Sequence, residues 1–141
     1  MSALPQASCS GRQSISIKEF EKGTIDPELF DHEAHVFIAW SYVQQYELKE
    51  SIDRFCAALR RLTKKLGIEA KYHETLSWFF MILIAERQSE SGSNNWQTFK
   101  RRNADLPATG PSIVRDYYSD ERIGSTIARS QFVMPDRLPL P

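Results

Sequence analysis

All three histidines of this 141-residue chain fall in two short stretches, HEAH and KYHETL. His32 and His35 are three residues apart, so on a helix their imidazoles share one face. His73 stands beside Glu74 at the start of a second helical pattern. Three imidazoles and one carboxylate are a sufficient ligand set for a divalent transition metal. The pattern therefore predicts a divalent-metal site formed by His32, His35, His73 and Glu74, and leaves the identity of the metal open.

The same residues have two other interpretations. The start of a helix carries partial positive charge, which disfavours a cation and favours a phosphate or a carboxylate, so an anion or organic-ligand site is one alternative. Structural histidines, hydrogen-bonded to backbone carbonyls, are the other. If a metal is bound, Tyr72 and Glu74 are the candidate catalytic residues, because either could transfer protons to a metal-activated water or substrate. The chain lacks Glu-x-x-His, HExxH and a Gly-rich phosphate loop, so whether it is an enzyme stays open.

Three long helical patterns must position these residues. The middle of the third, WFFMILI, is apolar all the way round, which is typical of a helix buried on all sides in its own chain or in a homodimer. Short connections make neighbouring helices antiparallel, so the third helix begins near the end where the first began. We therefore expect all three histidines at one end of a bundle. The three patterns cover residues 31–46, 49–66 and 73–90.

The rest of the chain divides into a flexible N-terminus at residues 1–14, a helical domain at residues 15–131 and a tail at residues 132–141. Short helices are expected within the domain after the third long pattern. Three prolines in the last seven residues exclude a helix there and favour an extended strip. We expect this tail to pack along its own domain, where it could cover the mouth of a pocket. The predicted fold is thus all-α: a compact antiparallel bundle of three long helices with short C-terminal helices and an extended Pro-rich tail.

Composition limits the partners of the protein. Eighteen basic residues balance eighteen acidic ones, so no excess positive charge points to nucleic acid. The longest apolar run, at residues 76–85, is about half the length that crosses a bilayer, so no membrane span is expected. The first residues lack the apolar core of a secretion signal, and Cys9 and Cys56 read as free thiols, which together favour the cytoplasm. Tyrosines near the histidines, Tyr72 foremost, favour a pocket for a small-molecule ligand.

Three stretches also carry a resemblance. They are FxHxxHxxxAW at residues 30–40, KYHET at residues 71–75 and PDRLPLP at residues 135–141. This pattern resembles a set of small uncharacterised bacterial helical proteins and spans most of the chain after Phe30. The resemblance implies no activity and assigns no role to any residue. The sequence thus predicts a small helical protein with a His/Glu metal site, and the alternatives are an anion or organic-ligand-binding protein and a non-catalytic interaction or dimerisation module.

Overall fold

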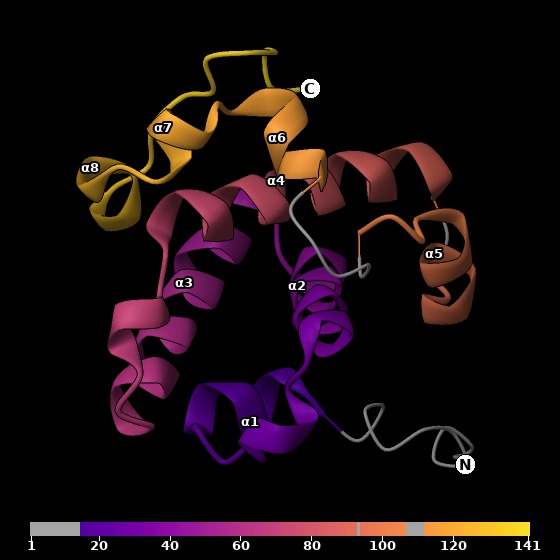
Figure 1. Ribbon diagram of the computed structural model, residues 1–141. Coiled ribbons are helices and arrows are strands. Elements are labelled where there is room, and N and C mark those ends of the chain that lie inside the picture. The colour runs from indigo at the N-terminus through magenta and orange to yellow at the C-terminus, as the bar shows by residue number, and fades with distance from the viewer. Residues whose placement is uncertain (1–14, 93, 107–111) are drawn as a thin grey trace, which may run out of the picture.

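The computed structural model describes residues 15–92, 94–106 and 112–141. These residues form helices and no strand, so the predicted all-helical class is confirmed for the described part of the chain (Figure 1). The predicted flexible N-terminus, with Cys9, lies outside the described residues. Among the described helices, none combines the length and the apolar character that crossing a membrane requires.

Three long helices dominate the fold, and each begins at a side chain that caps it. Asp31, Glu47 and His73 each accept a hydrogen bond from a backbone N–H of the first turn, which satisfies donors that have no partner inside the helix. The predicted boundaries are correct to within a residue or two. Asp31 and His73, the first residues of two predicted ranges, cap their helices instead of belonging to them. The three helices are α2 (His32–Gln45), α3 (Leu48–Lys65) and α4 (Glu74–Ser91).

Shorter helices flank them. At the N-terminal side, the helix α1 is capped by Ser16 and ends at Gly23, whose φ of 74° is a left-handed conformation that favours glycine. The short elements are α1 (Ile17–Lys22), η3 (Pro27–Leu29), η4 (Glu69–Lys71), α5 (Trp96–Arg102), α6 (Ser112–Tyr117), α7 (Asp120–Ile123) and α8 (Thr126–Ser130).

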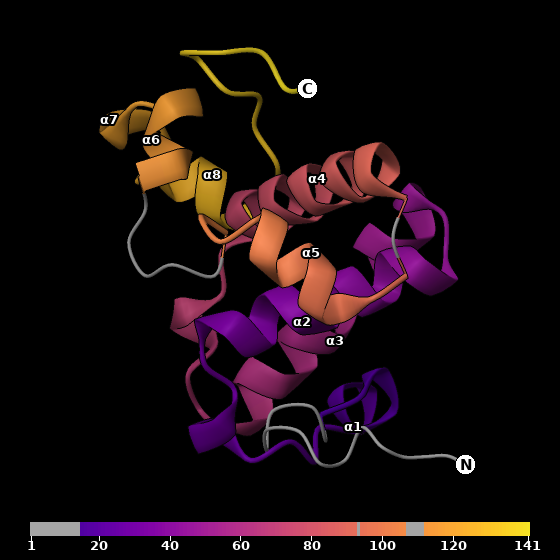
Figure 2. The ribbon, with the colours of Figure 1, turned by 90° about the vertical axis from the view of Figure 1, so that its right-hand side faces the viewer.

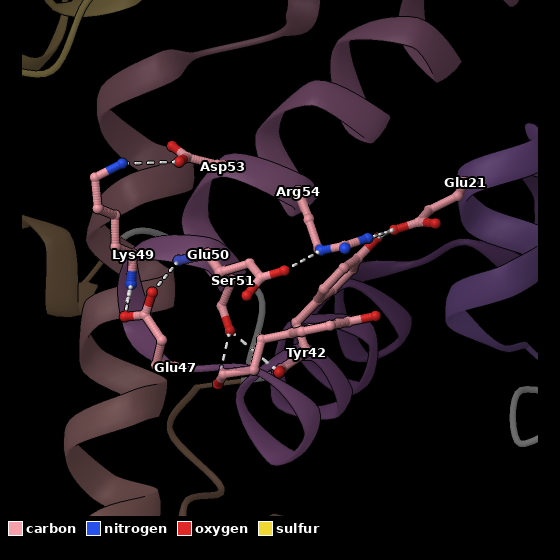
Figure 3. Close-up of polar contacts among 9 residues, drawn as sticks. Glu21, Tyr42, Glu47, Lys49, Glu50, Ser51, Asp53 and Arg54 are labelled. Carbon is pink, nitrogen blue, oxygen red and sulfur yellow. Dashed lines mark hydrogen bonds and ion pairs between the residues drawn. The ribbon is translucent and has the colours of Figure 1, made fainter.

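Polar contacts hold α1, α2 and α3 together (Figure 3). The fully buried Tyr42 of α2 donates its phenolic proton to Glu21 of α1 at 2.8 Å. Arg54 of α3 forms ion pairs with that same Glu21 and with Glu50. The buried Ser51 hydroxyl lies 3.1 Å from the carbonyl oxygen of Tyr42 and ties the start of α3 back to α2. These contacts fix the three helices that form one side of the fold.

Helix α4 lies between this side and the C-terminal helices. In Figures 1 and 2, α2 and α3 lie below α4, α6 and α7 lie higher than α4, and α8 lies beside its beginning. Phe79, Leu83 and Ile84 are buried, as predicted, but Phe80 and Ile82 are only half-buried. Phe79, Leu83 and Ile84 are thus covered within the chain, and a homodimer stays a prediction.

The finer prediction of an antiparallel bundle of the three long helices is not confirmed. Figure 1 shows α4 crossing above α2 and α3 instead of lying along both of them. The reason lies in the η4 turn and the segment around it, which carry the chain out of line with α3 before α4 begins.

The C-terminal tail is non-helical and packs along its own domain. Phe132 stacks on Trp78 of α4 with ring centroids 4.8 Å apart. Tyr118 donates its phenolic proton to the carbonyl oxygen of Val133 at 2.7 Å, and Ser119 donates from both its N–H and its hydroxyl to Asp136. The first residues of the tail therefore pack against α4, and Asp136 is held at the start of α7.

Thr75, which is fully buried on α4, anchors this C-terminal segment. Its hydroxyl lies 2.6 Å from the carbonyl oxygen of Ala128 and 2.9 Å from that of Gln131, and it accepts the N–H of Val133 at 3.1 Å. A methyl group in place of the hydroxyl would leave these buried backbone groups without a partner.

We expect the nearly isosteric Thr75→Val change to lower the free energy of unfolding by about 1–3 kcal/mol. Urea denaturation followed by circular dichroism measures this change. Thr75→Ser is the matched control, because it keeps the hydroxyl and removes only a methyl group. If Thr75→Val is as stable as the parent protein and Thr75→Ser is not, packing of the methyl group, and not hydrogen bonding, holds the segment.

Candidate functional site

All three histidines line one cavity between α2, α3 and α4. Its volume is about 210 Å³. His32 and His35 enter it from α2, His73 from the start of α4, and Lys71 from the end of η4. The remaining polar lining residue is Ser77, whose hydroxyl donates to the carbonyl oxygen of His73. The rest of the wall is apolar: Val36, Ala39, Phe55, Leu59, Leu76, Phe80, Met81 and Ile84.

His73 has both ring nitrogens engaged with the backbone. Nδ1 accepts the N–H of Leu76 at 3.2 Å, and Nε2 lies 2.8 Å from the carbonyl oxygen of Ile123, to which it must donate. Burial lowers the pKa of His73 below its usual range, against the opposite effect of the bond to Ile123. The ring is therefore neutral and serves as a structural link between α4 and α7, with no lone pair left for a ligand in this conformation.

His32 has one nitrogen engaged. Its Nε2 lies 2.9 Å from the carbonyl oxygen of Leu106, which fixes the proton on that nitrogen. The ring meets Phe80 edge-on with centroids 5.9 Å apart. No hydrogen bond joins its Nδ1 to another described residue.

His35 is the histidine whose hydrogen-bonding capacity is unused. Its ring stacks on Phe30 with centroids 4.0 Å apart, and no hydrogen bond joins it to another described residue. Burial, and next the nearby His32, lower the pKa of His35 to about 4, whereas Asp31 acts to raise it. At neutral pH the half-buried ring is uncharged and offers one N–H donor and one acceptor nitrogen.

Glu74 does not line this cavity with the histidines. One oxygen of its carboxylate accepts a hydrogen bond from Arg60 at 2.9 Å and another from the Tyr72 hydroxyl, and the second oxygen accepts from Trp78 at 2.9 Å. Burial, together with the bond to Glu74, raises the pKa of Tyr72, and burial raises that of the neighbouring Cys56 thiol to about 11. At neutral pH, Tyr72 and Cys56 are therefore protonated. This polar cluster joins α3 to the start of α4.

The four predicted metal ligands are thus divided between two environments. Within the described part of the chain, no group of three or more His, Cys, Asp or Glu side chains is arranged to hold a metal ion. Binding of a divalent metal by His32, His35, His73 and Glu74 stays a prediction, which elemental analysis of the purified protein tests directly.

A second cavity, of about 300 Å³, adjoins the first. His35, Leu59 and Lys71 line both, so the two meet at these side chains. Lys71 was not among the site residues predicted from the sequence. Its position two residues before His73 could have indicated that it lies near the same site. The remaining walls of the second cavity are Pro27, Phe30, Leu62, Thr63, Leu66, Ile68 and Tyr72.

Comparison with family models, with curated proteins and with solved structures found no match to this chain. The resemblance to small bacterial helical proteins therefore stays a prediction, and the interpretation of the site rests on its chemistry.

The lowered pKa of His35 predicts how stability varies with pH. Unfolded, the imidazole titrates near its ordinary value of 6.5, and folded near 4, so between these values the unfolded state binds more protons. Stability should therefore fall as pH falls from about 6.5 to about 4. His35→Phe keeps a ring to stack on Phe30 and removes the titration, so the fall should be smaller by on the order of 2 kcal/mol.

Urea denaturation at a series of pH values measures this difference. His73 also has a lowered pKa and contributes to the slope in both proteins, so only the difference between parent and variant reports on His35. His32, Asp31 and Lys71 are the other titratable groups near the ring and are unchanged in the variant. If the free energy of unfolding changes with pH in the same way in the parent protein and in His35→Phe, His35 is freely protonated in the folded protein and the prediction is wrong.

Proposed function

We propose that this protein binds a small, mainly apolar organic molecule in the cavity between α2, α3 and α4. The observation that carries the proposal is His35: a neutral imidazole without a hydrogen bond to any described residue, on the wall of an otherwise largely apolar cavity. Deeply buried polar groups are nearly always hydrogen-bonded. His35 is half-buried, so its partner is either water or a polar atom of a ligand in the cavity, and the apolar walls favour a ligand.

The dimensions of the cavity support a ligand of modest size. An engineered apolar cavity of about 150 Å³ binds benzene. A volume of about 210 Å³ therefore suits a substituted single ring or a short branched chain. Larger molecules would have to extend past Lys71 into the adjoining cavity.

Hydrogen bonds of three other polar side chains on the wall, those of His73, Ser77 and His32, support this proposal. The bonds of His73 and Ser77 join the start of α4 to backbone groups, and the bond of His32 joins α2 to Leu106. These side chains hold the walls in place, so their hydrogen bonds need not be broken when a ligand enters. A site that is already formed loses less conformational freedom on binding, which favours affinity.

Thermal denaturation with a panel of small probes tests the proposal. Phenol, p-cresol, indole and isovalerate span the expected size, with about seven to nine non-hydrogen atoms each. A probe present at about 100 times its Kd should stabilise the folded protein by about 2.7 kcal/mol and raise its Tm accordingly.

Ala39→Leu should abolish that rise, because it places three more carbon atoms inside the cavity. Ala85→Leu is the matched control: it adds the same carbon atoms to a half-buried position on α4 that lines neither cavity. No rise with any probe, or the same rise in Ala39→Leu as in the parent protein, contradicts the proposal.

A further inference from the structure

The junction of the two cavities combines a positive charge with the hydrogen-bonding capacity of His35. Lys71 lines both cavities, its side chain is exposed, and no ion pair joins it to another described residue. His35 lines both cavities as well. The third shared residue, Leu59, is apolar, so the polar chemistry of the junction belongs to one ammonium group and one neutral imidazole.

Two carboxylates near the junction have other partners. Asp31 caps α2 and accepts the N–H of Ala34 at 2.9 Å. Glu74 is paired with Arg60 and also accepts the Tyr72 hydroxyl. No ion pair joins Lys71 to a described carboxylate, Glu69 on the same short helix included, so its charge can attract an anion from outside the chain.

On the basis of the proposed function, we infer that the ligand is a monocarboxylic acid, with its carboxylate between the Lys71 ammonium and the His35 N–H and its apolar body in the 210 Å³ cavity. One unit of positive charge matches a monoanion. A carboxylate can accept from both groups at once, through charge-assisted hydrogen bonds to the ammonium group. A dianionic phosphate would leave charge uncompensated and would bring no apolar surface to the wall.

The apolar body belongs in the first cavity because of its walls. Eight apolar side chains from the three long helices line that cavity. The second cavity is bordered by Leu66 and Ile68, which are 37% exposed, and includes the hydroxyl-bearing Thr63 and Tyr72. Burial of the body removes more apolar surface from water in the first cavity than in the second.

Isothermal titration calorimetry with phenylacetate and phenylacetamide tests the inference. The two probes have nearly the same shape and differ in charge. The parent protein should bind phenylacetate roughly tenfold more tightly than the amide. Lys71→Met should lower the affinity for phenylacetate to that of the amide, and Lys71→Arg should keep most of the preference, because it retains the charge.

Lys64→Met is the matched control, because Lys64 is an exposed lysine near the end of α3 that lines neither cavity. It should change neither affinity. Equal binding of acid and amide by the parent protein, or an unchanged preference in Lys71→Met, overturns the inference and leaves the proposed function standing. A rise in Tm with inorganic phosphate as large as that with phenylacetate also overturns the inference. If neither these two probes nor the earlier panel binds, the proposed function itself fails.

Discussion

The fold depends on the burial of apolar side chains of α4. This helix carries apolar side chains round its whole circumference, and α2 and α3 pack against it from below while the C-terminal helices pack near its beginning. Thr75 and His73 fasten the C-terminal segment to the start of the helix. The cavity is left where the first turns of α2 and α4 meet α3, and Phe80 is half-buried because it faces this space.

Hydrogen bonding gives the three histidines different roles in the same cavity. His73 and His32 each use a ring nitrogen in a hydrogen bond to a backbone carbonyl oxygen, so both help to hold the walls of the cavity in place. His35 is held by stacking alone, so its position is fixed while its nitrogens stay available. The structural interpretation therefore applies to His73 and His32, and the proposed ligand-binding interpretation concerns His35.

The sequence allowed the helices to be predicted because their signals are local. Asp31 and Ser16 cap helices within four residues of their own positions, and the spacing of His32 and His35 places both on one helix face. The roles of the imidazoles could not be predicted, because their partners are distant. The carbonyl bonded by His32 lies 74 residues away, and that bonded by His73 lies 50 residues away. Likewise, adjacency in sequence suggested that Glu74 acts with His73. Its carboxylate instead accepts hydrogen bonds from Arg60 of α3 and from Trp78, away from the histidines.

The central claim is that His35 is the histidine that meets a ligand, whereas His73 helps to hold the walls of the cavity in place. Nitrogen-15 NMR of the imidazole rings, recorded with and without phenylacetate, measures this directly. The account predicts that both nitrogens of His73 keep the shifts of a neutral ring protonated at Nε2, while the nitrogens of His35 shift as ligand is added. Shifts at His73 with none at His35 would contradict it.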